Sequence, residues 1–264
     1  MDVTFWVTVA IFLSTYVLII SERLHRTVVA LAGAVLMVAL GIVTQDQAIQ
    51  GIDFNTLGLL IGMMVIVGIA KDSGMFQYLA IRITRLAKGN PMIIFPLFMV
   101  TVGVLSAVLD NVTTSLLMVP VMFVIANNLR VNPKPFLIGT ILFANLGGIA
   151  TLIGDPTNIL IGSAADLSFN DFLLNTAPAA VIGGLAVGGV LWLFFRRSFI
   201  TNVEARDRIM QFKAKEAISD WVLLRKSLVV IILVLIGFLS HQIIHLEGAT
   251  IALGGAALLL LLTL

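Results

Sequence analysis

The sequence contains no cysteine, which excludes disulfide bonds and thiolate metal sites from this protein. Charged residues are also scarce: they make up 11% of the 264 residues, whereas 59% are hydrophobic. The mean hydropathy of +1.10 lies far above the range of soluble domains. The 16 Lys and Arg are scattered between apolar segments, so no basic surface for nucleic acid is indicated. We expect an all-α polytopic membrane protein whose main partner is the lipid bilayer.

Long apolar segments predict the simple membrane spans. The first is expected to be a retained span and not a signal peptide, because it lacks a basic n-region and a convincing small-residue cleavage site. Each of the others is about long enough to cross the hydrocarbon core with some tilt or snorkelling. The predicted spans are 3–20, 27–43, 55–70, 172–195, 227–244 and 248–264.

Residues 71–90 are mixed in character. Apolar residues recur at helical spacing, and Arg82, Arg85 and Lys88 fall on the other face. This pattern predicts an amphipathic helix at the membrane interface. Its expected apolar face consists of Met75, Phe76, Leu79, Ile83 and Leu86.

Residues 91–128 contain two apolar arms around the polar stretch Asp110-Asn111-Val112-Thr113-Thr114-Ser115. The return arm, from Thr113 to Asn127, would rise only about 21 Å, which is short of a core of roughly 30 Å. This length favours a re-entrant hairpin whose tip reaches into the bilayer interior. The inbound arm also fits a full crossing, so two crossings remain an alternative on length alone.

Residues 134–164 form an apolar segment that is interrupted by three glycines, an aspartate and a proline. In hydrocarbon, non-helical backbone persists only against protein or a watery cavity. We predict a broken helix: one half up to about Leu146, an unwound segment at Gly147–Gly154, and a second half from Pro156. Asp155 would cap that second half. The alternative is a tight loop between two buried helices in which Asp155 is only a cap.

The basic residues predict the orientation. They lie in alternate connections, at 23–26, 71–88, 130–134 and 196–226, whereas 44–54 contains acidic residues and no Lys or Arg. By the positive-inside rule the N-terminus is outside and residues 196–226 form a cytoplasmic linker. We expect the plasma membrane as the location.

An internal repeat is indicated by the likeness of residues 25–40 to residues 246–261, with Ala30 aligned to Ala252. Apolar segments also resemble one another by chance. An odd number of predicted crossings separates the two copies, so the second would be inverted, as in many transporters. On this interpretation 1–195 is a first repeat and 227–264 begins an incomplete second one. The chain would then be a fragment of a protein of roughly 420 residues.

Two motifs, Leu109-Asp110-Asn111-Val112-Thr113-Thr114 and Gly147-Gly148-Ile149-Ala150-Thr151-Leu152-Ile153-Gly154-Asp155-Pro156-Thr157-Asn158, carry a family resemblance. Together they resemble the ion transporter superfamily, most closely the ArsB/NhaD permeases and the melanocyte P-protein branch, which are often labelled citrate-transporter-like. The resemblance covers nearly the whole chain, as the N-terminal portion of such a protein. It implies a scaffold domain and a moving transport domain, with a hairpin and a broken helix at the site.

The same resemblance assigns site residues. Asp110, Asn111 and Thr113 would lie at the hairpin tip, and the broken helix would contribute Gly148, Thr151, Gly154, Asp155 and Asn158. Related dicarboxylate carriers have Ser-Asn-Thr at the tip, and P-protein relatives often have a second proline where this chain has Thr157. These departures leave the substrate open.

Asp110 and Asp155 are the only acidic residues deep inside predicted membrane segments, where a carboxylate is costly and therefore a functional candidate. A Na⁺ site at Asp110, Asn111 and Asp155 would suit exchange between H⁺ and Na⁺. Helix N-termini at Thr113 and Pro156 would favour an anionic group in the same space. Neutral oxygens would come from Thr113, Thr114, Thr151 and Asn158, although ordinary hydrogen bonds between helices are the alternative role for each.

We therefore predict a secondary active transporter, coupled to H⁺ or Na⁺, for arsenite or another small anion, a citrate-like anion, or Na⁺/H⁺ exchange. No enzymatic activity and no cofactor are expected, and a homodimer is a candidate assembly. A passive channel is the alternative. An intramembrane aspartyl protease is a remote one, because Leu152 and Leu109 replace the glycine and tyrosine that its motifs require.

Overall fold

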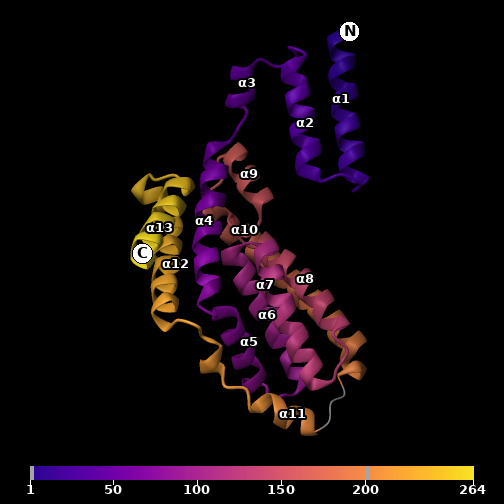
Figure 1. Cartoon of the computed structure of the whole chain (residues 1–264), viewed down its shortest axis with the longest axis vertical. Helices are drawn as coiled ribbons and strands as arrows, with labels where there is room; N and C mark the ends of the chain where they lie inside the picture. Colours follow the sequence, from indigo (N-terminus) through magenta and orange to yellow (C-terminus); the bar gives the residue numbers. More distant parts are fainter. Residues whose placement is uncertain (1–2, 200–202) are drawn as a thin grey trace. The chain divides into compact units, whose positions relative to one another are not determined.

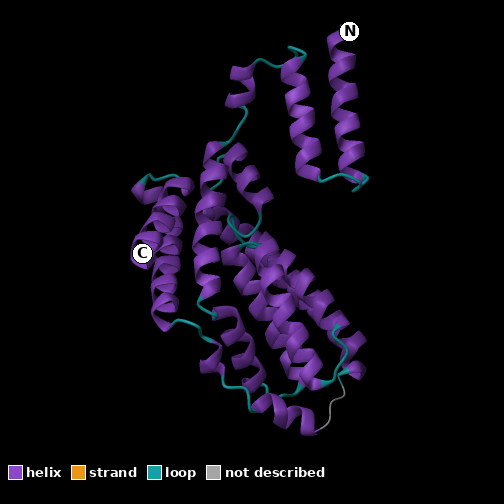
Figure 2. Cartoon of the chain, viewed as in Figure 1, coloured by secondary structure: helices purple, strands orange, loops and turns teal. Residues whose placement is uncertain are grey.

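The computed structural model describes residues 3–199 and 203–264. In this part of the chain every regular element is a helix, and no strand is present (Figure 2). Six of the described helices are long and apolar enough to cross a membrane. They are α1 (Val3–Ile20), α4 (Phe54–Asp72), α6 (Pro91–Leu109), α7 (Asn111–Leu129), α10 (Phe169–Phe195) and α12 (Trp221–Ile244). The prediction of an all-α polytopic membrane protein is confirmed.

The chain divides into two compact units, residues 1–53 and 54–264. The first unit contains α1, α2 (Arg26–Ala39) and a short helix, α3 (Gln45–Gln50). Helix α2 ends before residue 43, the predicted end of this span, because the chain turns at Gly41 with φ +67°. No helix was predicted at α3, although its capping box is visible in the sequence: Thr44 Oγ1 accepts a hydrogen bond from Gln47 N at 3.2 Å.

In the second unit α4 packs closely on α13 (Gly248–Thr263), and α12 packs beside both. Small residues bring the two backbones together: a Cβ at Gly62 would lie 2.5 Å from the carbonyl carbon of Ala252. The side chain of Asn55 supports the contact, because its Oδ1 accepts a hydrogen bond from Ala249 N at 2.9 Å. This bond satisfies one of the free donors at the start of α13.

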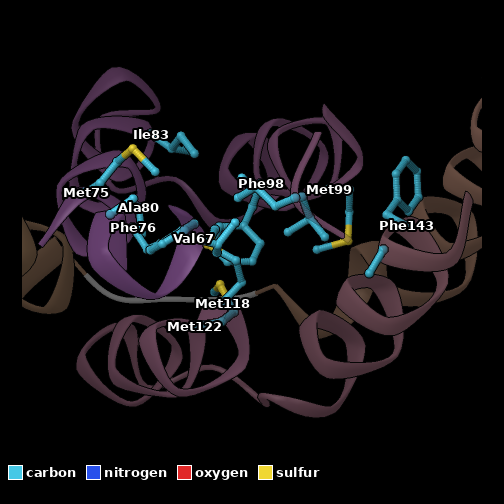
Figure 3. Packing of buried hydrophobic residues seen from close by; sticks show 14 of the residues in the cluster. Val67, Met75, Phe76, Ala80, Ile83, Phe98, Met99, Met118, Met122 and Phe143 are labelled. Carbon is cyan, nitrogen blue, oxygen red and sulfur yellow. The ribbon is translucent and has the colours of Figure 1, made fainter. Parts of the chain in front are cut away.

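Helix α5 (Met75–Leu86) follows α4 after a turn at Gly74, where φ is +81°. Its buried residues are Met75, Phe76, Ala80, Ile83 and Thr84, and the four apolar ones belong to the core shown in Figure 3. Leu86, which we predicted on the apolar face, is 70% exposed. The buried face is centred on Phe76, Ala80 and Ile83, so it is rotated away from Leu86 near the helix end.

The helices α6, α7 and α8 (Lys134–Ile149) lie side by side, and α9 (Pro156–Ala165) extends beyond their ends (Figure 1). Helix α7 has 19 residues, or about 28 Å, because it begins at Asn111 and ends at Leu129. It is longer than the predicted return arm of about 21 Å. Length therefore does not distinguish a re-entrant hairpin from two crossings.

The polar connection 196–226 contains short helices between α10 and α12. These are η1 (Arg196–Ser198), α11 (Val203–Met210) and η2 (Ala214–Ala217). Helix α12 begins before residue 227, the predicted start, because Asp220 Oδ1 caps it by accepting hydrogen bonds from Val222 N at 2.7 Å and Leu223 N at 3.1 Å. Helix α10 begins before residue 172 in the same way, with a capping box of Ser168 and Asp171.

A hydrophobic core joins α4, α5, α6, α7 and α8 inside the second unit (Figure 3). Phe98 and Met118 are fully buried in it, together with Met99 and Met122. Methionine fills irregular gaps because its side chain is unbranched and flexible. This core fixes the hairpin α6–α7 against α8 and so positions the candidate site.

Candidate functional site

A single residue, Asp110, joins α6 to α7. Its backbone has φ +113° and ψ 153°, a conformation that essentially only glycine adopts without strain. Its side chain caps α7, because Oδ1 accepts a hydrogen bond from Thr113 N at 2.7 Å. Strained backbone of this kind is concentrated at functional sites, which makes the hairpin tip a candidate.

The broken helix is interrupted at residues 150–155, between α8 and α9. Asp155 caps α9: its Oδ1 accepts hydrogen bonds from Thr157 N at 2.8 Å and from Thr157 Oγ1 at 2.6 Å. Pro156 is the first helical residue, a position where its missing N–H is not needed. The carboxylate thus lies where the chain leaves the break.

The predicted unwound segment began at Gly147, but the structure keeps residues 147–149 in α8. A Cβ at Gly147 would collide with the carbonyl of Gly103 on α6, and a Cβ at Gly148 would lie 2.8 Å from Gly154 O. These glycines are therefore required for close packing of backbones and not for unwinding. The prediction was wrong on this point, because glycine serves both purposes.

The hairpin tip meets the break directly. Asn111 Nδ2 donates hydrogen bonds to Asp155 Oδ2 at 2.6 Å and to Asn145 Oδ1 at 3.1 Å. Asn111 N donates to Gly154 O at 3.1 Å. The first turn of α7 is thereby attached to the residues that precede α9, and the two helix N-termini lie close together.

Two other predicted residues bond to backbone near the break. The Thr151 hydroxyl donates to Ala107 O on α6. Asn158 Nδ2 donates to Gly148 O at 3.0 Å and to Thr151 O at 2.9 Å. These carbonyls lack helical partners, and in hydrocarbon they would be costly if left free. Thr151 and Asn158 therefore make hydrogen bonds between helices, and their predicted role in ion binding stays a prediction.

Two acceptors near the tip have no hydrogen-bond partner among the described residues. They are Asn111 Oδ1 and Thr114 Oγ1, and the Thr114 side chain is 0% exposed. Most buried polar atoms in proteins are bonded, so unpaired ones require an explanation. Neutral oxygens of this type, together with carboxylates, are the ligands that a hard cation uses.

Sequence reasoning missed two polar residues at the site. Asn145 receives the second hydrogen bond of Asn111, and fully buried Ser106 donates to Ala144 O, joining α6 to α8. Both are polar residues in largely apolar helices, and this contrast was the available signal. Of the predicted residues, Asn111, Gly148, Gly154 and Asp155 are in direct contact, and Thr113 contributes its backbone N–H.

The donor set limits the ions that fit. Within residues 3–199 and 203–264 no group of three or more His, Cys, Asp or Glu is placed to hold a metal ion. Two carboxylates and neutral oxygens are compatible with protons or a hard monovalent cation, whereas transition metals prefer nitrogen and sulfur ligands. No Lys or Arg occurs in the two motifs.

Comparison with known proteins adds independent information. A family model described as "Citrate transporter" matches residues 16–264. A "46 kDa membrane protein" of Mycobacterium leprae is 37% identical over 261 residues, covering 97% of this chain and 61% of the relative. An "uncharacterized transporter" of Mycobacterium tuberculosis is 39% identical with the same coverage. The human P protein is 40% identical over 166 residues, covering 61% of this chain and 20% of that protein.

The chain spans about three fifths of the length of the mycobacterial relatives it matches. The matching family model covers the hairpin, the broken helix and the helices that follow them. The resemblance to the citrate-transporter-like and P-protein branch, which was based on two motifs, is confirmed. The chain belongs to the citrate transporter family.

Proposed function

We propose that this chain forms the ion-binding part of a secondary active transporter that couples a small ion to H⁺ or Na⁺. The observation that carries the proposal is the bond between Asn111 Nδ2 and Asp155 Oδ2 at 2.6 Å, because it joins the hairpin tip to the broken helix. Asp110, Asn111 and Asp155 bind the coupling ion, and Thr114 is a further oxygen donor. The N-termini of α7 and α9 supply partial positive charge for an anionic group.

The contact between the tip and the break supports a re-entrant hairpin. The tip ends at the break, and α9 continues for ten residues, or about 15 Å, beyond it alongside α4 (Figure 1). If α8 and α9 together cross the bilayer, the break and the tip lie in its interior. A full crossing by α6 would instead bring Asp110 to the opposite surface.

The family description makes a citrate-like anion one candidate substrate, beside arsenite and Na⁺ in exchange for H⁺. A transporter binds its ion at a closed site and saturates, whereas a channel does not. Flux in proteoliposomes that saturates and follows an opposing H⁺ or Na⁺ gradient would favour the carrier. Flux proportional to concentration would favour the passive channel. Peptide cleavage that depends on both aspartates would instead support the protease.

Asp155→Asn tests the site. Asn and Asp cap helices about equally well, so we expect normal folding with loss of H⁺- or Na⁺-coupled flux. Asp155→Ala should also lose the cap, at about 1 kcal/mol. The matched control is Asp46→Asn, because Asp46 is an exposed carboxylate in the first turn of α3. If Asp155→Asn shows the same flux and the same pH dependence as the wild type, the Asp155 carboxylate serves only as a helix cap.

The orientation follows from the charge pattern: N-terminus outside and 196–226 in the cytoplasm. This is testable by labelling single cysteines, since the chain has none of its own. Cysteines at Gln47 and Ser168 should react from outside, and one at Ala214 only after permeabilisation. External labelling at Ala214 would reverse the proposed orientation.

A further inference from the structure

A groove of about 720 Å³ lies between α6, α8 and α10. Helix α10 contacts α8 where the ring of Phe143 meets Gly184 and Gly188, and it is otherwise largely exposed. Small residues on α10, among them Ala177 and Ala180, form one wall of the groove. Because they are small, the wall is set back and leaves room for a ligand.

The lining of the groove is almost entirely apolar. Thr151 contributes a hydroxyl group to the lining, and this hydroxyl already donates a hydrogen bond to Ala107 O on α6. An ordered water needs two to four polar partners, which this lining does not provide. In a bilayer the occupant that fits is therefore a hydrocarbon chain.

Two arginines, Arg196 and Arg197, lie at one end of the groove, which is called its mouth below. Trp192 lines the groove, and the Arg196 guanidinium lies over its ring, 5.8 Å from the centroid. Arg197 follows in the same short turn, and both arginines are exposed. Among the described residues, the salt bridge that forms is Lys213–Glu216, and no carboxylate forms an ion pair with either arginine. The mouth therefore attracts a negatively charged group.

The groove also has the dimensions of a membrane ligand site. Its lining on α10 runs from Leu173 to Trp192, a rise of about 28 Å, close to the thickness of the hydrocarbon core. Trp192 then lies at an interface, where tryptophan is enriched, on the side that the charge pattern assigns to the cytoplasm. Basic pockets between helices on that side bind anionic lipid headgroups.

We propose that this groove binds an anionic phospholipid, with an acyl chain between α6, α8 and α10 and the phosphate on Arg196 and Arg197. Ala150 and Thr151 line the end of the groove away from Trp192, so the acyl chain would extend to the break of the broken helix. Its occupancy sets how closely α10 approaches α6 and α8. The proposal does not depend on the coupling ion or the substrate.

The test uses the purified 264-residue protein in detergent and two lipids with identical acyl chains, phosphatidylglycerol and phosphatidylcholine. Native mass spectrometry measures bound lipid. We expect saturable binding that favours phosphatidylglycerol. Replacing Arg196 and Arg197 together with Gln should weaken it by about fivefold per arginine. The matched control replaces Arg82 and Arg85, two exposed arginines of α5, and should keep the preference.

A second variant tests the groove itself. Gly189 lines the groove, and a Cβ there has no atom within 4 Å, so Gly189→Leu should take up space in the groove and reduce binding of both lipids. Gly254→Leu on α13 is the control, because its Cβ also has no neighbour within 4 Å. Equal loss in both arginine pairs, equal binding of the two lipids, or unchanged binding in Gly189→Leu would each overturn the proposal. Absence of bound lipid in the wild type would overturn it as well.

Discussion

Two helical hairpins at opposite ends of the sequence, α1–α2 and α12–α13, differ in how much of their surface is buried. Each hairpin has a glycine where its two helices meet: Gly33 lies against Thr15, and Gly255 against Val234. The glycines occupy equivalent positions when Ala30 is aligned with Ala252. This local likeness agrees with the predicted repeat, which stays a prediction.

The outer faces of the two hairpins diverge. In α13 the residues toward α4 are buried, with Ala252 at 0% exposure. Within the first unit by itself, the aligned residues of α2, Thr27, Ala30 and Ala34, are exposed, and α1 has no buried residue. The apolar sequence is sufficient to predict a helix at both α2 and α13. Burial required a partner, which α4 provides for α13 through Gly58 and Gly62.

The largest expected effect comes from breaking the buried contact. Gly62→Leu would force a side chain into the backbone of Ala252 and Leu253, and overpacking of this kind costs about 1–3 kcal/mol or more. Ala34→Leu, on the exposed face of α2, should change stability by less than about 0.5 kcal/mol. Thermal unfolding in detergent micelles, followed by circular dichroism, measures both. Similar losses in the two variants would mean that the outer face of α2 is also packed.

A smaller effect is expected at the start of α13. Asn55→Ala removes the acceptor for Ala249 N, and loss of a cap costs about 1 kcal/mol. Hydrogen exchange should speed up in the first turn of α13. As a control, Thr44→Ala removes a cap in the first unit and should affect α3 alone. Unchanged exchange in α13 would show that side-chain packing on α4 holds the helix without this bond.

The smallest effect is expected in the connection that precedes α12. Its exposed Lys213–Glu216 ion pair is 2.8 Å long. The hydrogen bond to Glu216, and then its charge, raise the pKa of Lys213 above the ordinary value of 10.5. The stability that this raised pKa contributes is present below pH 10.5 and is lost as the pH rises through the raised pKa. At neutral pH Glu216→Gln should leave the unfolding temperature unchanged, because exposed pairs contribute little. A clear decrease would mean that the connection helps to hold the α12–α13 hairpin.

Much of the helical pattern could be predicted because hydrophobic runs and capping residues act locally. The predicted bounds of α1 match the structure, and the start of α9 was predicted from Asp155-Pro156. The capping residues Asp220 and Thr44 were also visible in the sequence, but they were not used to predict the starts of α12 and α3. The helix bounds therefore depend on capping as much as on hydropathy.

What could not be predicted depends on contacts distant in sequence. The glycines at 147 and 148 indicated unwinding until their neighbours Gly103 and Gly154 were known. Asn145 carries no motif, and its role follows only from the position of Asn111. The exposure of Leu86 likewise reflects where other helices cover α5. The predicted ion-binding roles of Asp110 and Asp155 stay predictions.

The close approach of Gly147 to the carbonyl of Gly103 has a consequence for the rate of the proposed transport cycle. The backbones of α6 and α8 are in contact at these two glycines, and Asn111 at the start of α7 is hydrogen-bonded to Gly154. The three helices α6, α7 and α8 are therefore held together as one packed group. In the proposed transporter, opening the site to the other side of the membrane would displace these helices together. Collective motions of this size take microseconds to milliseconds, whereas side-chain rotations take nanoseconds or less. We expect turnover to be limited by that displacement and not by release of the ion from its ligands.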